Sequence, residues 1–350
     1  MRSTERQRTP KDTDRRLRSS GGRAQIITIM YVLGCEITIG TKRFNRVNEV
    51  TIERSAHSLE DVCEIKLPAT ARLVRGTEVI GEEEVAKTFA AGDEVIVKLG
   101  YDGVLREEFR GYVTSIKPEV PVVVKCIDGM YHLQRKNCLQ SWKSVKLDEV
   151  LEYLVEGTPI SLIGEVPTIT FTKFYLRNVT AAYALQQLKE KYGLVIYLKG
   201  NGLYVSLARH DDGTEVRYEF GVNVIESKLE WVTEDDKRLK VEAVHIRKDN
   251  TRLKVEVGDK DGEKRTLYYY DVESEAALRK LAENDMKKLR YSGYKGDMTT
   301  FLLPNVEPGN VGVIQDNDWP ERDGKYIVEK VTTTYGSQGA RRKINLGLKV

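Results

Sequence analysis

Hydrophobic and polar residues alternate in short runs along the first third of the chain, with the period of two that is typical of β-strands. The runs are Val47–Ser55, Val62–Leu67, Glu94–Tyr101, Leu105–Ile116 and Val120–Cys126. Asp102-Gly103 is typical of a tight hairpin turn, because glycine accepts the positive φ that such a turn requires. A charged segment of variable pattern, Arg72–Thr88, interrupts the strands. We therefore expect a small β-barrel domain over residues 30–127.

A helical period appears in the middle of the chain. One apolar stripe has the i, i+3, i+4, i+7 spacing of an amphipathic helix, and Gly157 is placed to end it. The stripe consists of Leu147, Val150, Leu151 and Leu154. A second helix is predicted to begin after Asn178 or Thr180, either of which can cap it, and to end at Gly193. With the hairpin that follows, these elements predict an α+β domain over residues 128–210.

Strand-like runs return after residue 210, and one long helix interrupts them. The predicted strands are Val216–Phe220, Leu239–Ile246, Arg252–Val257, Arg265–Tyr270, Asp297–Leu303, Val311–Gln315, Tyr326–Tyr335 and Lys343–Val350. Ser274 is placed to cap the helix and Gly293 to end it. Its predicted inward residues are Ala277, Leu278, Leu281, Ala282 and Leu289. Residues 211–350 should therefore form a second β-barrel domain with one long helix. The expected fold is mainly β (α+β overall), with two small barrels flanking an α+β insert.

The basic charge of the chain lies at its N-terminus. The whole chain has a formal net charge of +3, whereas residues 1–29 hold eight basic and three acidic residues, a net of +5, which leaves −2 for residues 30–350. A nearly neutral body lacks the basic face of a dedicated duplex-DNA binder. The polar, Arg-rich segment 1–29 is predicted to be a disordered basic tail. We favour a dispensable extension over a nucleic-acid-binding arm, because Met30 directly precedes the first strand-like run and is a candidate start.

Cysteine and histidine are few and scattered. The residues are Cys35, Cys63, Cys126, Cys138, His57, His132, His210 and His245. Metal sites need clustered ligands at short spacings, and no CxxC or HExxH pattern occurs. We expect reduced thiols and no metal site. No stretch reaches the roughly 20 apolar residues of a membrane-spanning helix, so no such segment is expected.

Acidic and glycine-rich clusters are the other candidates for chemistry. The acidic runs Glu82-Glu83-Glu84 and Glu234-Asp235-Asp236 are interpreted as solvated loop charge, because a glycosidase needs two carboxyls in different environments about 5–10 Å apart. Gly21-Gly22 and Gly200-Asn201-Gly202 lack the spacing of a phosphate-binding loop and are predicted turns. No GxSxG elbow occurs, which leaves only a spatial Ser-His-Asp triad open. We expect no catalytic and no cofactor-binding residues.

Two groups of tyrosines have ring faces suited to stacking on bases. They are Tyr268-Tyr269-Tyr270 and the set Tyr175, Tyr183 and Tyr192. On strands and helices such residues more often pack into cores or interfaces, and we favour that interpretation.

Two groups of motifs follow one another in a recognisable order. The first group is the run Phe89–Gly103 with Gly92-Asp93 and Gly100-Tyr101-Asp102-Gly103, then Phe109–Ile116, then Asp128–Tyr131. The second group is Tyr291–Gly296, Pro308-Gly309, Gly324–Val331 and Gly339–Gly347. The first resembles the first barrel of the phage late control protein D family, the baseplate hub proteins, and the second resembles the closing barrel of the same hubs. The order of the motifs over about 30–350 carries the resemblance.

This resemblance implies a structural protein of a phage tail or contractile injection system rather than an enzyme. In the family, three chains with two barrels each form a pseudo-sixfold ring that adapts the tail tube to a central spike. A homotrimer in the virion tail or baseplate, assembled in the host cytoplasm, is therefore expected. Implied partners are the tail tube protein, a separate spike protein, and tape measure and baseplate wedge proteins, with DNA or cargo only passing through the channel.

Two other functions stay open. The runner-up is a tail-associated cell-wall-degrading enzyme, a glycosidase or peptidase, which an acidic pair facing one cleft would favour. A DNA-binding or packaging protein comes third, and it would depend on the tail 1–29.

Overall fold

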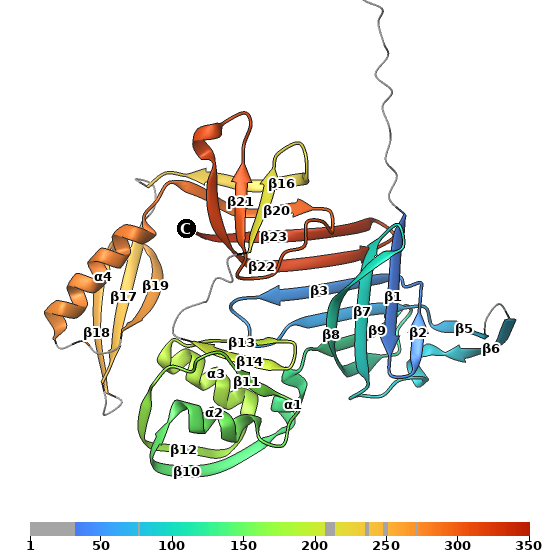
Figure 1. The fold of residues 1–350 in the computed structure, drawn as a ribbon, viewed down its shortest axis with the longest axis horizontal. Coiled ribbons are helices and arrows are strands. Elements are labelled where there is room, and N and C mark those ends of the chain that lie inside the picture. The colour runs from blue at the N-terminus through green and yellow to red at the C-terminus, as the bar shows by residue number, and fades with distance from the viewer. Residues whose placement is uncertain are drawn as a thin grey trace, which may run out of the picture.

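The computed structural model describes residues 32–75, 78–206, 214–234, 238–247, 251–269, 272 and 274–350 (Figure 1). The predicted basic tail and Met30 lie outside these residues. Within them the chain is mostly β with several sheets, which confirms the mainly β fold class. None of the helices described is long and apolar enough to cross a membrane.

Thirteen of the described strands belong to one sheet, which runs through both regions that were expected as barrels (Figure 1). Its N-terminal strands are β1 (Leu33–Ile39), β2 (Lys42–Phe44), β3 (Glu49–Ser55), β4 (Val62–Leu67), β7 (Glu94–Tyr101), β8 (Val104–Lys117) and β9 (Val122–Ile127). Its C-terminal strands are β15 (Glu215–Glu219), β16 (Val224–Val232), β20 (Gly293–Thr300), β21 (Val311–Gln315), β22 (Gly324–Gly336) and β23 (Gly339–Lys349). The two groups meet where β3 pairs antiparallel with β22.

The alternating pattern produces these strands because each strand buries one side. In β7, Val95, Val97 and Leu99 are buried against the N-terminal core, while the residues between them face outward. The turn after β7 has the expected geometry: Asp102 and Gly103 have φ values of 52° and 82°. The turn therefore fixes the register in which β8 returns along β7.

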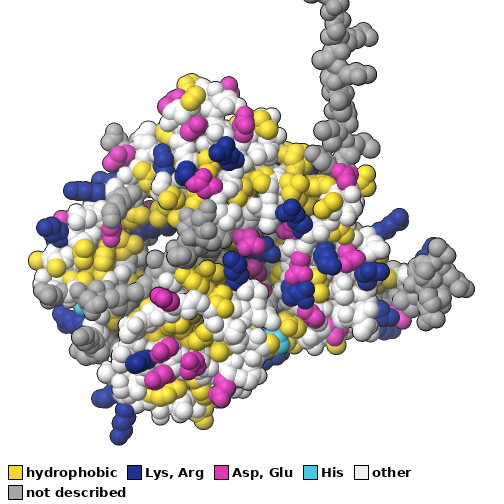
Figure 2. Space-filling view, in the orientation of Figure 1, with side chains coloured by type: hydrophobic (Ala, Val, Ile, Leu, Met, Phe, Trp, Pro, Cys, Tyr) yellow, Lys and Arg dark blue, Asp and Glu magenta, His cyan; other side chains and the backbone are white. Residues whose placement is uncertain are grey.

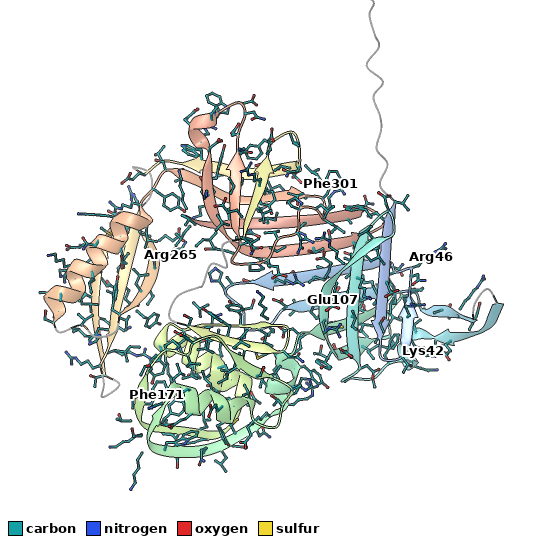
Figure 3. The ribbon with its side chains drawn as sticks, in the orientation of Figure 1. Lys42, Arg46, Glu107, Phe171, Arg265 and Phe301 are labelled. Atoms are coloured by element: carbon teal, nitrogen blue, oxygen red, sulfur yellow. The ribbon has the colours of Figure 1, made fainter. Side chains whose placement is uncertain are left out.

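Most of the described residues of Arg72–Thr88, a segment expected to be variable, belong to a hairpin of their own. The elements of this hairpin are β5 (Thr70–Arg75), β6 (Glu78–Glu84) and a short 3-10 helix, η1 (Val85–Lys87). The hairpin projects from the body of the molecule (Figure 1). Lys42 reaches it from β2, with Nζ 3.0 Å from Glu83 Oε2 (Figure 3). Successive glutamates on β6 mask the period of two in the sequence.

The middle of the chain combines two longer helices with short strands. Its elements are α1 (Met130–Arg135), β10 (Asn137–Lys146), α2 (Leu147–Val155), β11 (Ser161–Ile163), β12 (Thr170–Thr180), α3 (Ala181–Tyr192), β13 (Val195–Lys199) and β14 (Gly202–Ser206). The predicted apolar stripe of α2 is fully buried. Thr180, not Asn178, caps α3 by accepting the Tyr183 N–H at 3.2 Å, and Gly193 ends the helix with a φ of 63°.

The strands β10 and β12 pair into a ribbon that curves around α2 and α3 (Figure 1). Phe171 points from β12 into the core between the ribbon and the helices (Figure 3). It packs there against Tyr192, with ring centroids 4.7 Å apart. The ribbon is therefore apolar on its concave side and open to solvent on its convex side.

A separate small sheet carries the long helix. The strand β17 (Leu239–Ile246) pairs with β18 (Arg252–Gly258) and β19 (Glu263–Tyr269), and α4 (Glu275–Leu289) packs across β17 and β18 (Figure 1).

The predicted inward side of α4 is partly wrong. Leu278 and Ala282 are buried, but Ala277 is exposed and Leu281 is 41% exposed. Because the helix packs against one small sheet, only a narrow stripe of its surface is covered. The helix also ends before the predicted Gly293, which begins β20 instead.

η2 (Pro320–Arg322) is a single 3-10 turn between β21 and β22. It completes the elements of the described chain.

Candidate functional site

The junction of the two strand groups makes one surface from the two ends of the sequence. Between β3 and β22, Glu53 lies opposite Thr332 and Thr51 lies opposite Thr334, with these side chains on the outward side. On the inner side, Ile52 is buried opposite Thr333. Ladder hydrogen bonds between β3 and β22 therefore continue the sheet without a break from residues near the N-terminus to residues near the C-terminus.

A buried ion pair fastens the same junction. Arg342 on β23 is fully buried, and its Nη2 donates to both carboxylate oxygens of Glu108 at 2.8 and 2.9 Å. Its Nη1 donates to the Asn305 amide oxygen at 2.6 Å. A register shift in β8 opposite Val97 and Lys98 leaves Glu108 as the extra residue of a bulge, which turns its side chain inward. Because an unpaired buried charge is costly, each group depends on the other, and the pair ties β8 to β23.

Sequence reasoning missed this pair. The sequence offers no local signal, because Glu108 falls at an outward position of the strand period, where a charged residue is ordinary. Only the bulge seen in the structure turns its side chain inward. Its partner, 234 residues away in sequence, has no local signal at all.

The outward side of β20, β23, β22, β3, β4 and β9 forms a second feature, here called the polar sheet face. Oppositely charged side chains meet across its strands. The pairs, by Nζ to carboxylate oxygen, are Lys330–Glu53 at 2.6 Å, Lys66–Glu49 at 2.7 Å, Lys343–Asp297 at 3.2 Å and Lys125–Glu64 at 3.9 Å. Figure 2 shows acidic and basic side chains intermixed in the region of β3 and β8. Balanced charges of this kind give a hydrated surface without the concentrated positive charge that binds a phosphate chain.

A cleft of about 410 Å³ lies beside the junction, between the sheet, the β13–β14 hairpin and the loop 307–310. A second hollow of about 200 Å³ shares Arg54, Asp61 and Glu307 with it. Arg54 Nε lies 3.4 Å from Asp61 Oδ2, and its Nη1 lies 3.6 Å from Glu307 Oε1. The same guanidinium donates to the main-chain oxygen of Glu108, which connects the cleft to the buried ion pair.

Asp128 also lines the second hollow. Burial, and after it the neighbouring charge of Asp61, raises the pKa of Asp128 to about 7. Its carboxyl accepts the main-chain N–H of Asp61 at 3.1 Å and that of Met130 at 3.0 Å. Two acids, Asp61 and Asp128, therefore face the second hollow. Asp61 is paired with Arg54, and Asp128 holds the start of α1 and the preceding loop in place.

Two of the four cysteines, expected to be scattered, lie together. Cys63 and Cys126 are opposite each other on β4 and β9, and both are buried. Burial raises the pKa of both thiols, that of Cys126 to about 12. In the part of the chain that is described, no group of three or more His, Cys, Asp or Glu residues is arranged to hold a metal ion. His210 lies outside that part.

The acidic run on β6 is exposed and paired within its surroundings. Its contacts are Glu82 with Arg72 at 3.5 Å, Glu83 with Lys42 at 3.0 Å and Glu84 with Lys87 at 2.7 Å. Gly200-Asn201 forms the turn between β13 and β14. Asp235, Asp236 and Gly21-Gly22 lie outside the described residues.

The tyrosine candidates separate into two situations. The Tyr268 hydroxyl donates to the Glu190 carbonyl at 2.7 Å, and the Tyr269 hydroxyl donates to Asp285 at 2.9 Å, so both fasten elements together. Tyr270 lies outside the described residues. The structure brings the other three to one groove between β12 and α3, which is lined by Tyr175, Tyr183 and Tyr192 among others.

Comparison with known proteins identifies the fold. No protein-family model matches the chain, and no curated protein matches it significantly in sequence. A 43 kDa tail protein of prophage MuSo2 from Shewanella oneidensis superimposes with a TM-score of 0.59 at 14% identity, covering 91% of this chain and 98% of that one. A tail protein from Neisseria meningitidis MC58 gives a TM-score of 0.58 at 15% identity, over 91% of this chain and 97% of that one. The chain has the fold of these tail proteins.

A type VI secretion protein shares the fold as well. The E. coli c3393 protein, itself similar to the T4 tail proteins gp27 and gp5, superimposes with a TM-score of 0.52 at 12% identity, over 89% of this chain and 76% of that one. These similarities agree, at the level of the fold, with the phage-tail resemblance that the sequence motifs carry.

Proposed function

We propose that the chain is a structural protein of a phage-type tail or baseplate, and not an enzyme. The observation that carries the proposal is the fold shared over 91% of the chain with nearly the full length of two tail proteins. Within that role we assign it to the hub, where it adapts the tail tube to a separate central spike. Its location is then the virion tail or baseplate, with assembly in the host cytoplasm.

The hub is proposed to be a homotrimeric ring with pseudo-sixfold symmetry. Two observations support this. Each chain contributes two strand groups, so three copies supply six strand groups around an axis. The end strands of the described, branched sheet are β2, β15 and β16, and an end strand offers unpaired backbone groups to a neighbouring chain. A contact between two different surfaces of identical chains closes into a ring when the rotation fits.

The polar sheet face is proposed to line the channel. Its balanced ion pairs, such as Lys330 with Glu53, leave little net attraction for a passing phosphate chain. DNA or cargo would then pass without being held. Tail tube, spike, tape measure and baseplate wedge proteins are the proposed partners of the two ring surfaces.

The test is the mass of the purified chain by light scattering, together with averaged negative-stain images. A trimer whose projection is a ring with six similar lobes supports the hub. A chain that stays monomeric at high concentration, both alone and with its tube and spike proteins, argues against the ring.

The second hollow, with its two acids, is the one observation that favours the cell-wall-degrading enzyme. Asp61 and Asp128 face it together, and the pKa of Asp128 is raised to about 7, as suits a general acid. Both carboxyls are already bonded within the protein, which favours a structural role. Clearing of a peptidoglycan suspension by the wild type, abolished by Asp128→Asn, would establish the enzyme; equal inactivity of both supports the structural function.

A further inference from the structure

The groove between β12 and α3 has the form of a peptide-binding site. It has a volume of about 300 Å³ and runs along consecutive β12 residues from Thr172 to Arg177 on one side. The other side is a face of α3 that includes Tyr183 and Gln187. A groove with one strand wall and one helix wall accommodates a single extended chain.

The strand wall offers an edge for pairing. Among the described strands, β12 pairs with β10 alone, so its other edge, from Lys173 to Arg177, faces the groove without a neighbouring strand. An edge of this kind accepts an added strand through main-chain hydrogen bonds, whatever the sequence of that strand. The side chains around the edge then decide which strand is accepted.

Those side chains are basic. Lys173, Arg177 and Lys191 line the groove, and no carboxylate does so among the described lining residues. Arg177 and Lys191 are exposed, and neither guanidinium nor ammonium is engaged in an ion pair within the described chain. The Arg177 guanidinium lies 4.5 Å from the centre of the Tyr175 ring, which holds it over the strand with its N–H donors available.

The tyrosines favour a peptide over a nucleic acid. Tyr192 is 8% exposed and packs against Phe171, so its ring is unavailable for stacking on a base. One face of Tyr175 is covered by Arg177. Tyr175 and Tyr183 are 57% and 53% exposed, so one face of the Tyr175 ring and the Tyr183 ring are what a base could reach. Binding of single-stranded nucleic acid relies on several open rings in succession.

We propose that this groove binds an extended acidic segment of a partner protein. The segment adds to the edge of β12 as a strand, and its carboxylates pair with Arg177 and Lys191. The site is separate from the polar sheet face and from the sheet edges at β2, β15 and β16. The groove proposal therefore does not depend on the ring proposal. Either proposal can be wrong while the other is right.

The experiment measures fluorescence polarisation of a labelled synthetic peptide of alternating glutamate and valine, added to the full-length protein. A peptide of alternating lysine and valine tests charge. A glutamate-valine peptide N-methylated at every second residue tests strand pairing, because it keeps the charge and loses main-chain donors. Oligothymidine of similar length represents nucleic acid.

The variants are Arg177→Glu and Lys191→Glu, with Lys117→Glu as the matched control. Lys117 is exposed on β8, outside the groove, and its change alters the net charge by the same amount. Circular dichroism establishes that all three proteins are folded.

The expected result is binding of the acidic peptide that each groove variant weakens by at least about tenfold and Lys117→Glu leaves unchanged. The N-methylated and lysine peptides should bind at least about tenfold more weakly than the acidic one. Three binding results overturn the proposal, and one result on self-association does so too. The binding results are no binding of the acidic peptide at millimolar concentration, equal binding by wild type and Arg177→Glu, and preferential binding of oligothymidine. The protein could also self-associate without binding the peptide, and Arg177→Glu could abolish that self-association. The occupant of the groove would then be a second copy of the chain, which likewise overturns the proposal.

Discussion

The junction between the strand groups and the edge of the β10–β12 ribbon use the same chemistry in opposite ways. At the junction, Arg342 is fully buried and bonded to both oxygens of Glu108. At the ribbon, Arg177 is exposed and lies over the Tyr175 ring. The first arginine is neutralised inside the protein, whereas the second keeps its donors for another molecule.

Burial accounts for the difference. A charge removed from water is stable only with a partner of good geometry, so the junction requires both members of its pair. A charge left in water contributes little to folding, so its position is free to serve binding. The junction should therefore be sensitive to substitution in stability, and the ribbon edge sensitive in binding alone.

Loss of one member of the buried pair is the most severe test of this contrast. Glu108→Ala leaves Arg342 buried without its carboxylate, and we expect the free energy of unfolding to fall by about 3–5 kcal/mol. Urea denaturation followed by circular dichroism measures it. Arg177→Ala at the ribbon should change the same quantity by less than about 0.5 kcal/mol.

A double substitution sharpens the interpretation. Glu108→Leu together with Arg342→Met removes both charges at similar volume, and its stability should return to within about 1–2 kcal/mol of the wild type. A double variant as unstable as Glu108→Ala would mean that the hydrogen bond from Arg342 to Asn305, and not the ion pair, fastens the junction.

The helix beside the groove repeats the contrast within one element. Leu185 on α3 is fully buried, whereas Tyr183 is 53% exposed in the groove. Leu185→Ala creates a cavity and should lower the free energy of unfolding by about 2–4 kcal/mol. Tyr183→Ala should lower it by less than about 0.5 kcal/mol. Similar losses from both changes, in thermal or urea unfolding, would show that the groove side of α3 is part of the core.

Asp128 predicts a pH dependence where the middle of the chain meets the sheet. Its pKa is about 7 in the folded protein and about 3.9 in an unfolded chain, so the folded state holds an extra proton between these values. Stability from this group is therefore full below about pH 4 and is lost as the pH rises through 7, by on the order of 1–3 kcal/mol. Between pH 5 and 8, in urea titrations, the wild type should lose stability relative to Asp128→Asn. A difference that stays constant with pH contradicts the raised pKa.

Strands with a continuous buried side were predictable from the sequence. Val62–Leu67, Leu239–Ile246 and Val311–Gln315 form strands with the predicted bounds. Each buries apolar side chains, such as Cys63, Ile65 and Leu67 in the first of them. The strands β10 and β16 were missed. Most of their side chains are exposed or half-exposed, so a hydrophobic period is lacking, and main-chain pairing with β12 and β20 determines their conformation.

The candidate sites were less predictable than the fold. Glu108 and Arg342 lie far apart in sequence, and only the pairing of β3 with β22 brings their strands together. The groove tyrosines were recognised as candidates, but their neighbours Lys173 and Lys191 come from two elements whose packing no local pattern specifies. The domain boundaries after residues 127 and 210 stay predictions.

The smallest effect is expected on the polar sheet face, where an ion pair lies at the same junction but in water. Lys330 on β22 and Glu53 on β3 are 2.6 Å apart, with side chains 39% and 43% exposed. Because solvent screens such a pair, Lys330→Ala should lower the free energy of unfolding by less than about 1 kcal/mol, and high salt should reduce the loss further. Urea denaturation at low and high ionic strength measures both. A loss that approaches that of Glu108→Ala would mean that the outward ion pairs, and not the buried one, hold the two strand groups together. Such a result would also argue against this face as a channel lining. Residues that stabilise the fold cannot be exchanged freely, whereas the residues of a channel lining must be free to change with the DNA or cargo that passes.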